Sequence, residues 1–243
     1  MKSILLTNDD GINAEGLEAL RSEICRIAHV IVVAPDRERS AVSHGLTIHT
    51  SLKIQDAGPD KFSLNGMPAD CVMYALEKMF IEPPDMVISG INHGANLGDN
   101  VMYSGTVAAA REAAKYGIPA IAVSQEYEDG KKVRFKDGSE FIRDMVKAML
   151  DNGLKGEILL NVNIPMQKIK SARITRHGCS ENPRYFNIPP SDMTGFLKNE
   201  LITDRMAIFE GNVSITPLQR DQTDYAAARS MAQNAEQWLL KKR

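Results

Sequence analysis

The sequence predicts an α/β fold built on a doubly wound, mostly parallel sheet, with inserted antiparallel strands and a helical C-terminal tail. Short apolar runs rich in β-branched residues alternate along the chain with segments whose apolar residues recur every three or four positions. The apolar runs are continuous, which is typical of parallel strands buried on both faces. Most of these runs end close to a turn that contains Gly, Pro or Asp, so the expected elements are short and separated.

The first elements form a strand–helix–strand unit. Apolar runs occupy residues 2–7 and 30–35. Between them, residues 15–28 place Leu17, Leu20, Ile24 and Ile27 on one helical face that can cover a sheet. Two strands joined by a helix in about 35 residues are parallel.

The same alternation continues to about residue 165. Helices are expected at residues 68–80, 106–116 and 139–150, and strands at 85–89, 120–123 and 158–162. Gly117 with Pro119 marks the end of the second of these helices, and Ser139 is the expected N-cap of the third. Five strands interleaved with four helices predict the doubly wound sheet.

Three segments depart from the alternation. Residues 46–54 and 62–64 alternate with period two, which predicts inserted antiparallel strands. Residues 171–218 are loop-rich, with short strand-like pieces at 206–209 and 213–215. The tail is an amphipathic helix that holds the sole Trp238. We therefore expect a single domain over 1–243, with a core at about 1–165, an appendage at 171–218 and a terminal helix at about 222–243.

Composition excludes several classes of protein. The 29 Lys and Arg against 31 Asp and Glu give a net charge of −2, which provides no broad positive field for a nucleic-acid polymer. The three cysteines are far apart and form neither a disulfide framework nor a metal-binding pair. No apolar run reaches the length of a signal-peptide core at the N-terminus or of a membrane span elsewhere. We expect a cytoplasmic protein with no membrane partner.

The turns that follow the strands are the places to search for a site, because ligands of open parallel sheets bind beyond the carboxyl ends of the strands. Asp9 and Asp10 follow the first strand. Adjacent ionised carboxylates at a buried strand end need a positive partner, and Mg²⁺ or Mn²⁺ with oxygen ligands fits. Alternatively, Asp9 caps the next helix and Asp10 belongs to a tight turn. No GxGxxG follows this strand, which argues against a dinucleotide site.

Two further turns and one helix start are expected at the same edge. Ser40 lies in a charged turn that could equally be a solvated loop, and Asn92 and Asn96 lie in a glycine-rich turn with His93, which we interpret as an orienting or incidental residue. Residues 103–107 open an alanine-rich helix whose N–H groups and hydroxyls suit a phosphate, although a simple Ser or Thr N-cap explains them too. A metal beside a phosphate seat suggests hydrolysis of a phosphate ester.

Seven strings in order between residues 4 and 218 resemble the SurE family, the stationary-phase survival proteins that are metal-dependent 5′/3′-nucleotidases. They are residues 4–11, 33–40, 66–72, 89–98, 103–110, 161–165 and 203–218, the last of these interrupted. The resemblance implies a Rossmann-like sheet of the SurE type. The strings depart from the family around 180–186, where this chain has an abbreviated segment; the departure concerns substrate preference and oligomer contacts.

The resemblance also implies the site and the reaction. One divalent cation, Mg²⁺ or Mn²⁺, is expected on Asp9, Asp10, Ser40 and Asn92, and the phosphate beside Asn96, Ser104, Gly105 and Thr106. Asp9, Asp10 and Asn96 are the expected catalytic residues. The implied reaction converts nucleoside monophosphates to nucleoside and phosphate, with 5′- and 3′-nucleotidase activity and exopolyphosphatase activity on short polyphosphate. The implied assembly is a homodimer or homotetramer held by an exchanged C-terminal helix and the 171–218 appendage.

Two other functions stay open from the residues alone. A metal-dependent deacetylase of amino sugars also has paired acids after its first strand, but it would need histidine ligands, and none is adjacent to Asp9 and Asp10. A nucleotide-binding regulator without turnover could use the same pocket as a sensor.

Overall fold

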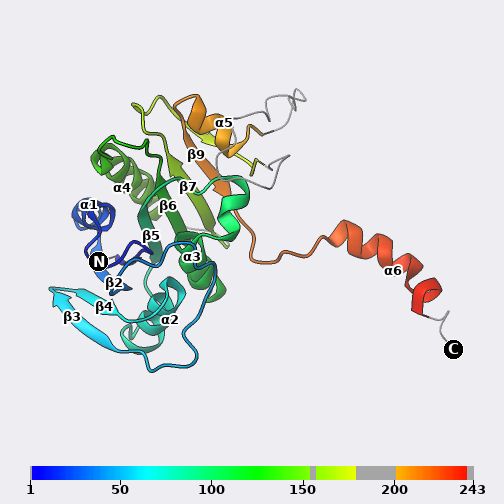
Figure 1. Cartoon of the computed structure of the whole chain (residues 1–243), viewed down its shortest axis with the longest axis horizontal. Coiled ribbons are helices and arrows are strands. Elements are labelled where there is room, and N and C mark those ends of the chain that lie inside the picture. The colour runs from blue at the N-terminus through cyan, green and yellow to red at the C-terminus, as the bar shows by residue number, and fades with distance from the viewer. Residues whose placement is uncertain (1, 154–156, 179–200, 240–243) are drawn as a thin grey trace.

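A computed structural model describes residues 2–153, 157–178 and 201–239, and it confirms the α/β fold class. Nine strands form one sheet in the order β3-β4-β2-β1-β5-β6-β7-β9-β8 (Figure 1). The strands are β1 (Ser3–Thr7), β2 (His29–Pro35), β3 (Ile54–Gly58), β4 (Lys61–Leu64), β5 (Met86–His93), β6 (Ala120–Gln125), β7 (Leu159–Ile164), β8 (Ala172–Ile174) and β9 (Val213–Pro217). The helices are α1 (Glu15–Ile24), α2 (Pro68–Lys78), α3 (Gly105–Lys115), α4 (Phe135–Asp151), α5 (Asp204–Phe209) and α6 (Tyr225–Leu239), with a 3₁₀ helix at Gly98–Met102.

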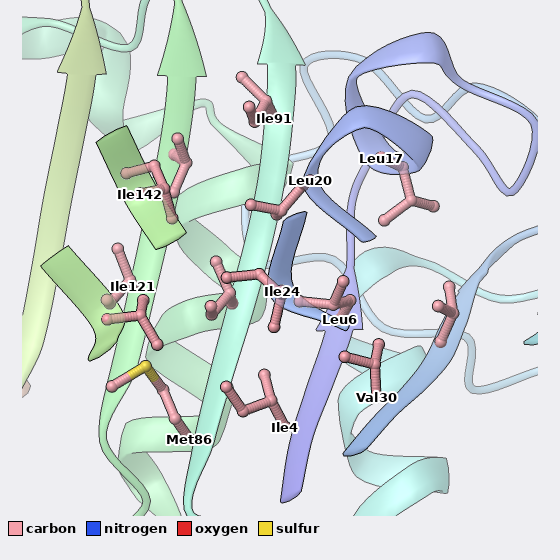
Figure 2. Close-up of a cluster of buried hydrophobic side chains, with 14 of the residues drawn as sticks. Ile4, Leu6, Leu17, Leu20, Ile24, Val30, Met86, Ile91, Ile121 and Ile142 are labelled. Atoms are coloured by element: carbon pink, nitrogen blue, oxygen red, sulfur yellow. The ribbon is translucent and has the colours of Figure 1, made fainter. Parts of the chain in front are cut away.

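The five central strands are parallel, as predicted, and helices cover both faces of the sheet. β2, β1, β5, β6 and β7 pair in parallel. On one face α1 packs beside α4, and Figure 2 shows Leu17, Ile24 and Ile142 from these helices meeting strand residues in one apolar cluster. α2 and α3 pack on the other face through a second cluster that includes Val72 and Val107. The carboxyl ends of the five strands therefore open at one edge of the sheet.

The prediction of a strand over 46–54 is wrong except at its last residue, because β3 begins at Ile54. The backbone N–H groups of Thr47 and Lys53 donate to the side chains of Asp70 and Asn65 and not to a neighbouring strand. The strand predicted at 62–64 is confirmed as part of β4. β4 pairs antiparallel with β3, as expected, but parallel with β2.

Two local predictions are also wrong. α4 begins at Phe135 with Arg134 as its N-cap, so Ser139 lies inside the helix, where its hydroxyl donates to the carbonyl of Lys136 at 2.9 Å. The strand predicted at 206–209 is instead the end of α5, whose N-cap Thr203 accepts a hydrogen bond from the N–H of Met206 at 3.2 Å. Four residues are too few for periodicity to separate helix from strand, and the cap decides between them.

The segment after β7 extends the sheet before the chain leaves it. β9, which confirms the strand predicted at 213–215, pairs antiparallel with β7, and β8 pairs parallel with β9. The departure noted at 180–186 lies outside the described residues. α6 projects away from the layered body (Figure 1), and every residue from 219 to 232 is exposed. Among the described helices, none is long and apolar enough to cross a membrane.

Candidate active site

The turn after β1 carries Asp9 and Asp10 to the edge where the strands end. The side chain of Asn8 closes this turn, because its amide donates to the carbonyl of Gly11 at 2.9 Å and its oxygen accepts from the Gly11 N–H at 3.2 Å. Gly11 has a φ of +98°, a conformation that other residues rarely adopt. Asp10 thus lies in a tight turn. Asp9 does not cap α1, since the N-cap of that helix is Ala14 and no side chain caps it.

Asp9 is a buried carboxylate held against the start of α3. Its side chain is only 5% exposed in the protein. The hydroxyl of Thr106 donates to Asp9 Oδ1 at 2.5 Å. Burial is the main reason that the pKa of Asp9 rises to about 6; the Thr106 hydrogen bond lowers it, and the negative charge of Asp10 raises it further. The site therefore holds its central carboxylate in surroundings that disfavour the negative charge.

Asp10 joins the glycine-rich turn after β5 to the same edge. Its Oδ2 accepts from the backbone N–H of His93 at 2.9 Å. Burial raises the pKa of Asp10, against the lowering effect of that hydrogen bond and of the His93 charge. Asn92 is the residue before His93, and its own amide donates to the carbonyl of Gly94 at 2.7 Å. His93 contributes its backbone to this contact while its ring stacks on Tyr127, with 4.5 Å between centroids, which fits the orienting or incidental role expected for it.

Ser40 reaches the site through the turn after β2. The backbone N–H of Arg39 donates to the carbonyl of Asp9 at 2.7 Å, so the residue before Ser40 is fixed to the β1 turn. The hydroxyl of Ser40 donates to Glu38 Oε1 at 2.5 Å, which leaves its lone pairs available to a cation. Asp10, Ser40 and His93 line one cleft of about 330 Å³, together with Ala14, Glu15, Gly16, Glu38 and Phe135. Ser40 itself and residues 36–38 are exposed, so the turn is solvated, but it lines the same cleft as Asp10.

The start of α3, where a phosphate is expected, packs against Asp9. Ser104 is the N-cap, and its oxygen accepts from the N–H of Val107 at 3.1 Å, so the simple capping explanation holds for this oxygen. The Ser104 O–H remains a donor, and the first-turn N–H groups of Gly105 and Thr106 have no acceptor within the helix. A Cβ on Gly105 would lie 2.9 Å from Asp9 Cβ, closer than real side chains approach. Glycine at this position lets the helix start touch the carboxylate.

Asn96 lies on the other side of the glycine-rich turn, 9% exposed and facing β6 and β7. Its side-chain amide donates to Ser124 Oγ at 2.7 Å, and its backbone N–H donates to Asn163 Oδ1 at 2.7 Å. Hydrogen bonds thus join Asp9 to Thr106 and Asp10 to His93, the neighbour of Asn92. Asn96 is instead hydrogen-bonded to side chains of β6 and β7.

The candidate ligands suit a hard divalent cation. Carboxylates from Asp9 and Asp10, a hydroxyl from Ser40 and an amide oxygen from Asn92 form an oxygen donor set. Burial raises the pKa of both carboxyls, because it removes water from their ionised forms, and a cation would offset that loss of solvation. The described parts of the chain contain no cluster of three or more His, Cys, Asp or Glu residues that could hold a metal.

Sequence reasoning missed the residues that support the site. Ser124, Asn161 and Asn163 are completely buried beneath Asn96, and Asp204 is completely buried beside Gly98. A signal was present for two of them: Asn161 and Asn163 are two polar residues spaced by two in an otherwise apolar strand, so they share one face of the sheet. Asp204 lies in the last of the seven strings that resemble the SurE family, but the resemblance assigns no role to it; it reaches Gly98 across 106 positions of sequence.

Comparisons with known proteins agree with the resemblance drawn from the sequence. The family description "Survival protein SurE" matches residues 4–183. The chain is 41% identical to the 5′-nucleotidase SurE of Aeromonas hydrophila over 92% of this chain and 94% of that protein. It is 40% identical to the 5′-nucleotidase SurE of Desulfatibacillum aliphaticivorans over 98% and 99% of the two chains. The crystal structure of the SurE protein from Aquifex aeolicus superposes with a TM-score of 0.83 at 36% identity, covering 96% of this chain and 99% of that one.

Proposed function

The chain belongs to the SurE family of survival proteins, and on that premise we propose that it is a metal-dependent phosphomonoesterase that hydrolyses nucleoside monophosphates to nucleoside and phosphate. The relatives that carry the name 5′-nucleotidase support the 5′ position. Action on 3′-nucleotides and on short polyphosphate is the wider form of the same proposal, since each presents a terminal phosphate to the same seat.

The observation that carries the proposal is the hydrogen bond between Thr106 and Asp9. It fixes a strand-end carboxylate directly against the N-terminus of α3, at 2.5 Å. The proposed cation ligand Asp9 and the helix start proposed to bind the phosphate thereby lie within one side chain of each other. A phosphate ester is a ligand that needs both.

Asp9, Asp10, Ser40 and Asn92 would hold the cation, Mg²⁺ or Mn²⁺. When bound, the cation polarises a phosphate oxygen and acidifies a water molecule. The N–H groups of Gly105 and Thr106 and the O–H of Ser104 donate to the phosphate oxygens as negative charge builds on them. The amide of Asn96 donates a further hydrogen bond at the same stage.

A carboxylate of the β1 turn accepts the proton of the attacking water. Asp9 is one candidate, and the Thr106 hydroxyl already holds its Oδ1. Asp10 is the other, and its Oδ2 accepts from the backbone N–H of His93. Substituting each carboxylate by Asn in turn, and measuring the rate of phosphate release, distinguishes which of the two is the general base.

The test is phosphate release from AMP and GMP by protein treated with EDTA and then supplied with Mn²⁺ or Mg²⁺. We expect release that depends on the added cation and is lost in Asp9→Asn. Metal-independent release, or an unchanged rate in Asp9→Asn, would contradict the proposal. Nucleotide binding without any release would instead support the regulator.

We also propose that the protein assembles with copies of itself, as a homodimer or homotetramer, through α6 and the 171–218 appendage. α6 extends away from the body (Figure 1), and it exposes Tyr225 and Met231 by more than half. Among the described residues no element covers this helix, and a helix with exposed apolar residues is stabilised when a second chain covers it.

A further inference from the structure

Asn96 is held by an unusually complete set of buried hydrogen bonds for a loop residue. Its backbone N–H donates to Asn163 Oδ1 at 2.7 Å, and its carbonyl accepts from Asn163 Nδ2 at 3.0 Å. The same carbonyl accepts from Asn161 Nδ2 at 2.8 Å, and the side-chain amide of Asn96 donates to Ser124 Oγ at 2.7 Å. Every partner is completely buried.

These partners come from two neighbouring strands at the edge where the site opens. Ser124 of β6 and Asn163 of β7 are register partners, so their side chains stand together on one face of the sheet. Ser124 is also the register partner of Asn92 in β5. Ser124, which contacts the Asn96 amide, therefore lies on the strand next to β5, which carries the candidate metal ligand Asn92.

We infer that Ser124 is a positioning residue that fixes the side-chain amide of Asn96 toward the phosphate, and that Asn163 fixes the backbone of the same residue. This inference rests on the proposed function, in which Asn96 donates to the phosphate.

The chemistry of the amide explains how Ser124 acts. An Asn amide nitrogen has two hydrogens, and Ser124 takes one of them, so the second hydrogen points in a fixed direction. Without the Ser124 oxygen, the amide can rotate about its terminal torsion, for which no strong staggered preference exists. A hydrogen-bond donor that stabilises the negative charge of the transition state loses most of that stabilisation when it is displaced by about 1 Å.

Asn163 acts on the backbone by the same donor and acceptor pairing that joins two strands. Its amide reproduces a peptide group, accepting from the N–H and donating to the carbonyl of one residue. The loop at Asn96 is thereby held by a pair of backbone hydrogen bonds of the kind that joins neighbouring strands.

A double-mutant cycle tests the inference. The variants are Ser124→Ala, Asn96→Ala and the two combined, and the matched control is Ser139→Ala. Ser139 is a buried serine on α4 whose hydroxyl donates to the carbonyl of Lys136 at 2.9 Å, so the control removes the same buried group without touching Asn96 or its partners.

We expect Ser124→Ala to lower kcat by about 10- to 100-fold with KM changed much less, because a donor used in the transition state is misplaced. In the Asn96→Ala background, the same substitution should change kcat by less than about twofold, since its target is gone. Mn²⁺ affinity and the thermal unfolding temperature should stay close to those of the parent, and the control should keep the parent kcat.

An equal loss of kcat in both backgrounds would overturn the inference, because Ser124 would then act on the fold and not through Asn96. An unchanged kcat in Ser124→Ala would overturn it as well. If Ser124→Ala shows no cooperative unfolding, the cycle is run with Ser124→Cys, which keeps a similar volume but accepts hydrogen bonds weakly.

Failure of the proposed function is recognised separately, as a parent protein that releases no phosphate from any nucleotide. In that case the same cycle is measured by titration calorimetry with inorganic phosphate in the presence of Mn²⁺. Weaker phosphate binding in Ser124→Ala that disappears in the Asn96→Ala background would support the positioning role, and additive losses would refute it.

Discussion

Asp9→Asn is predicted to stabilise the metal-free protein while it removes the activity. The substitution keeps the shape of the side chain and keeps an oxygen that accepts from Thr106, but it removes the buried negative charge. A carboxyl whose pKa is higher in the folded state than in the unfolded state makes folding less favourable as the pH rises above the unfolded pKa, and this cost is complete once the pH exceeds the folded pKa. The cation that would offset this charge is absent under these conditions.

The magnitude follows from the pKa of Asp9, which burial moves from 3.8 to about 6. Each pH unit between the unfolded and folded pKa corresponds to about 1.4 kcal/mol, so the charge costs about 3 kcal/mol at pH 8. The stability of the parent should rise as the pH falls through 6 toward 4, because protonation removes the charge. The advantage of Asp9→Asn should therefore shrink to about half at pH 5.

The assay is urea unfolding of both proteins in EDTA at pH 8 and pH 5. Asp129→Asn is the matched control, since Asp129 lies in an exposed loop and loses the same charge; its free energy of unfolding should change by less than about 0.5 kcal/mol. With saturating Mn²⁺ at pH 8, only the parent should gain stability, by about 3 kcal/mol at a concentration 100 times Kd. Equal stabilities of parent and Asp9→Asn in EDTA at pH 8 would refute the reasoning, as would a difference that does not change with pH.

Three further predictions concern the helix start, the support of the loop and the tail. Gly105→Ala should weaken Mn²⁺ binding by about tenfold or more in a titration. The new methyl group would lie 2.9 Å from Asp9 Cβ, so the Asp9 side chain must move. An unchanged Mn²⁺ affinity would count against this packing. Asp204→Ala should lower the free energy of unfolding, measured in urea, by about 3 kcal/mol or more. The reason is that the Asp204 carboxylate accepts from three backbone N–H groups, among them that of Gly98 at 2.8 Å. A loss below about 1 kcal/mol would show that water replaces the carboxylate as the acceptor. Deletion of residues 222–243 should lower the mass of the assembly measured by light scattering, and an unaltered mass would contradict a role for α6 between subunits.

Much of the fold could be predicted because its elements are determined locally. The continuous apolar run at the first strand and the helical spacing of Leu17, Leu20 and Ile24 each report burial that the structure confirms. The strand predicted at 46–54 failed because a distant side chain decides the backbone there. Leu46 and Ile48 alternate like strand residues, yet Asp70 from α2 binds the intervening Thr47, and both apolar side chains stay exposed.

The sequence predicts which residues form the candidate site and at which edge of the sheet they lie, because the turns that carry them follow strands directly and the carboxyl ends of parallel strands open together. What each residue can do at that edge depends on contacts that form only in the folded chain. Burial raised the pKa of Asp9, the start of α3 supplied its hydrogen bond, and strand register placed Ser124 and Asn163 beneath Asn96. These properties depend on groups separated by 28 to 97 positions in the chain, and such contacts exist only after the sheet has brought the strands together.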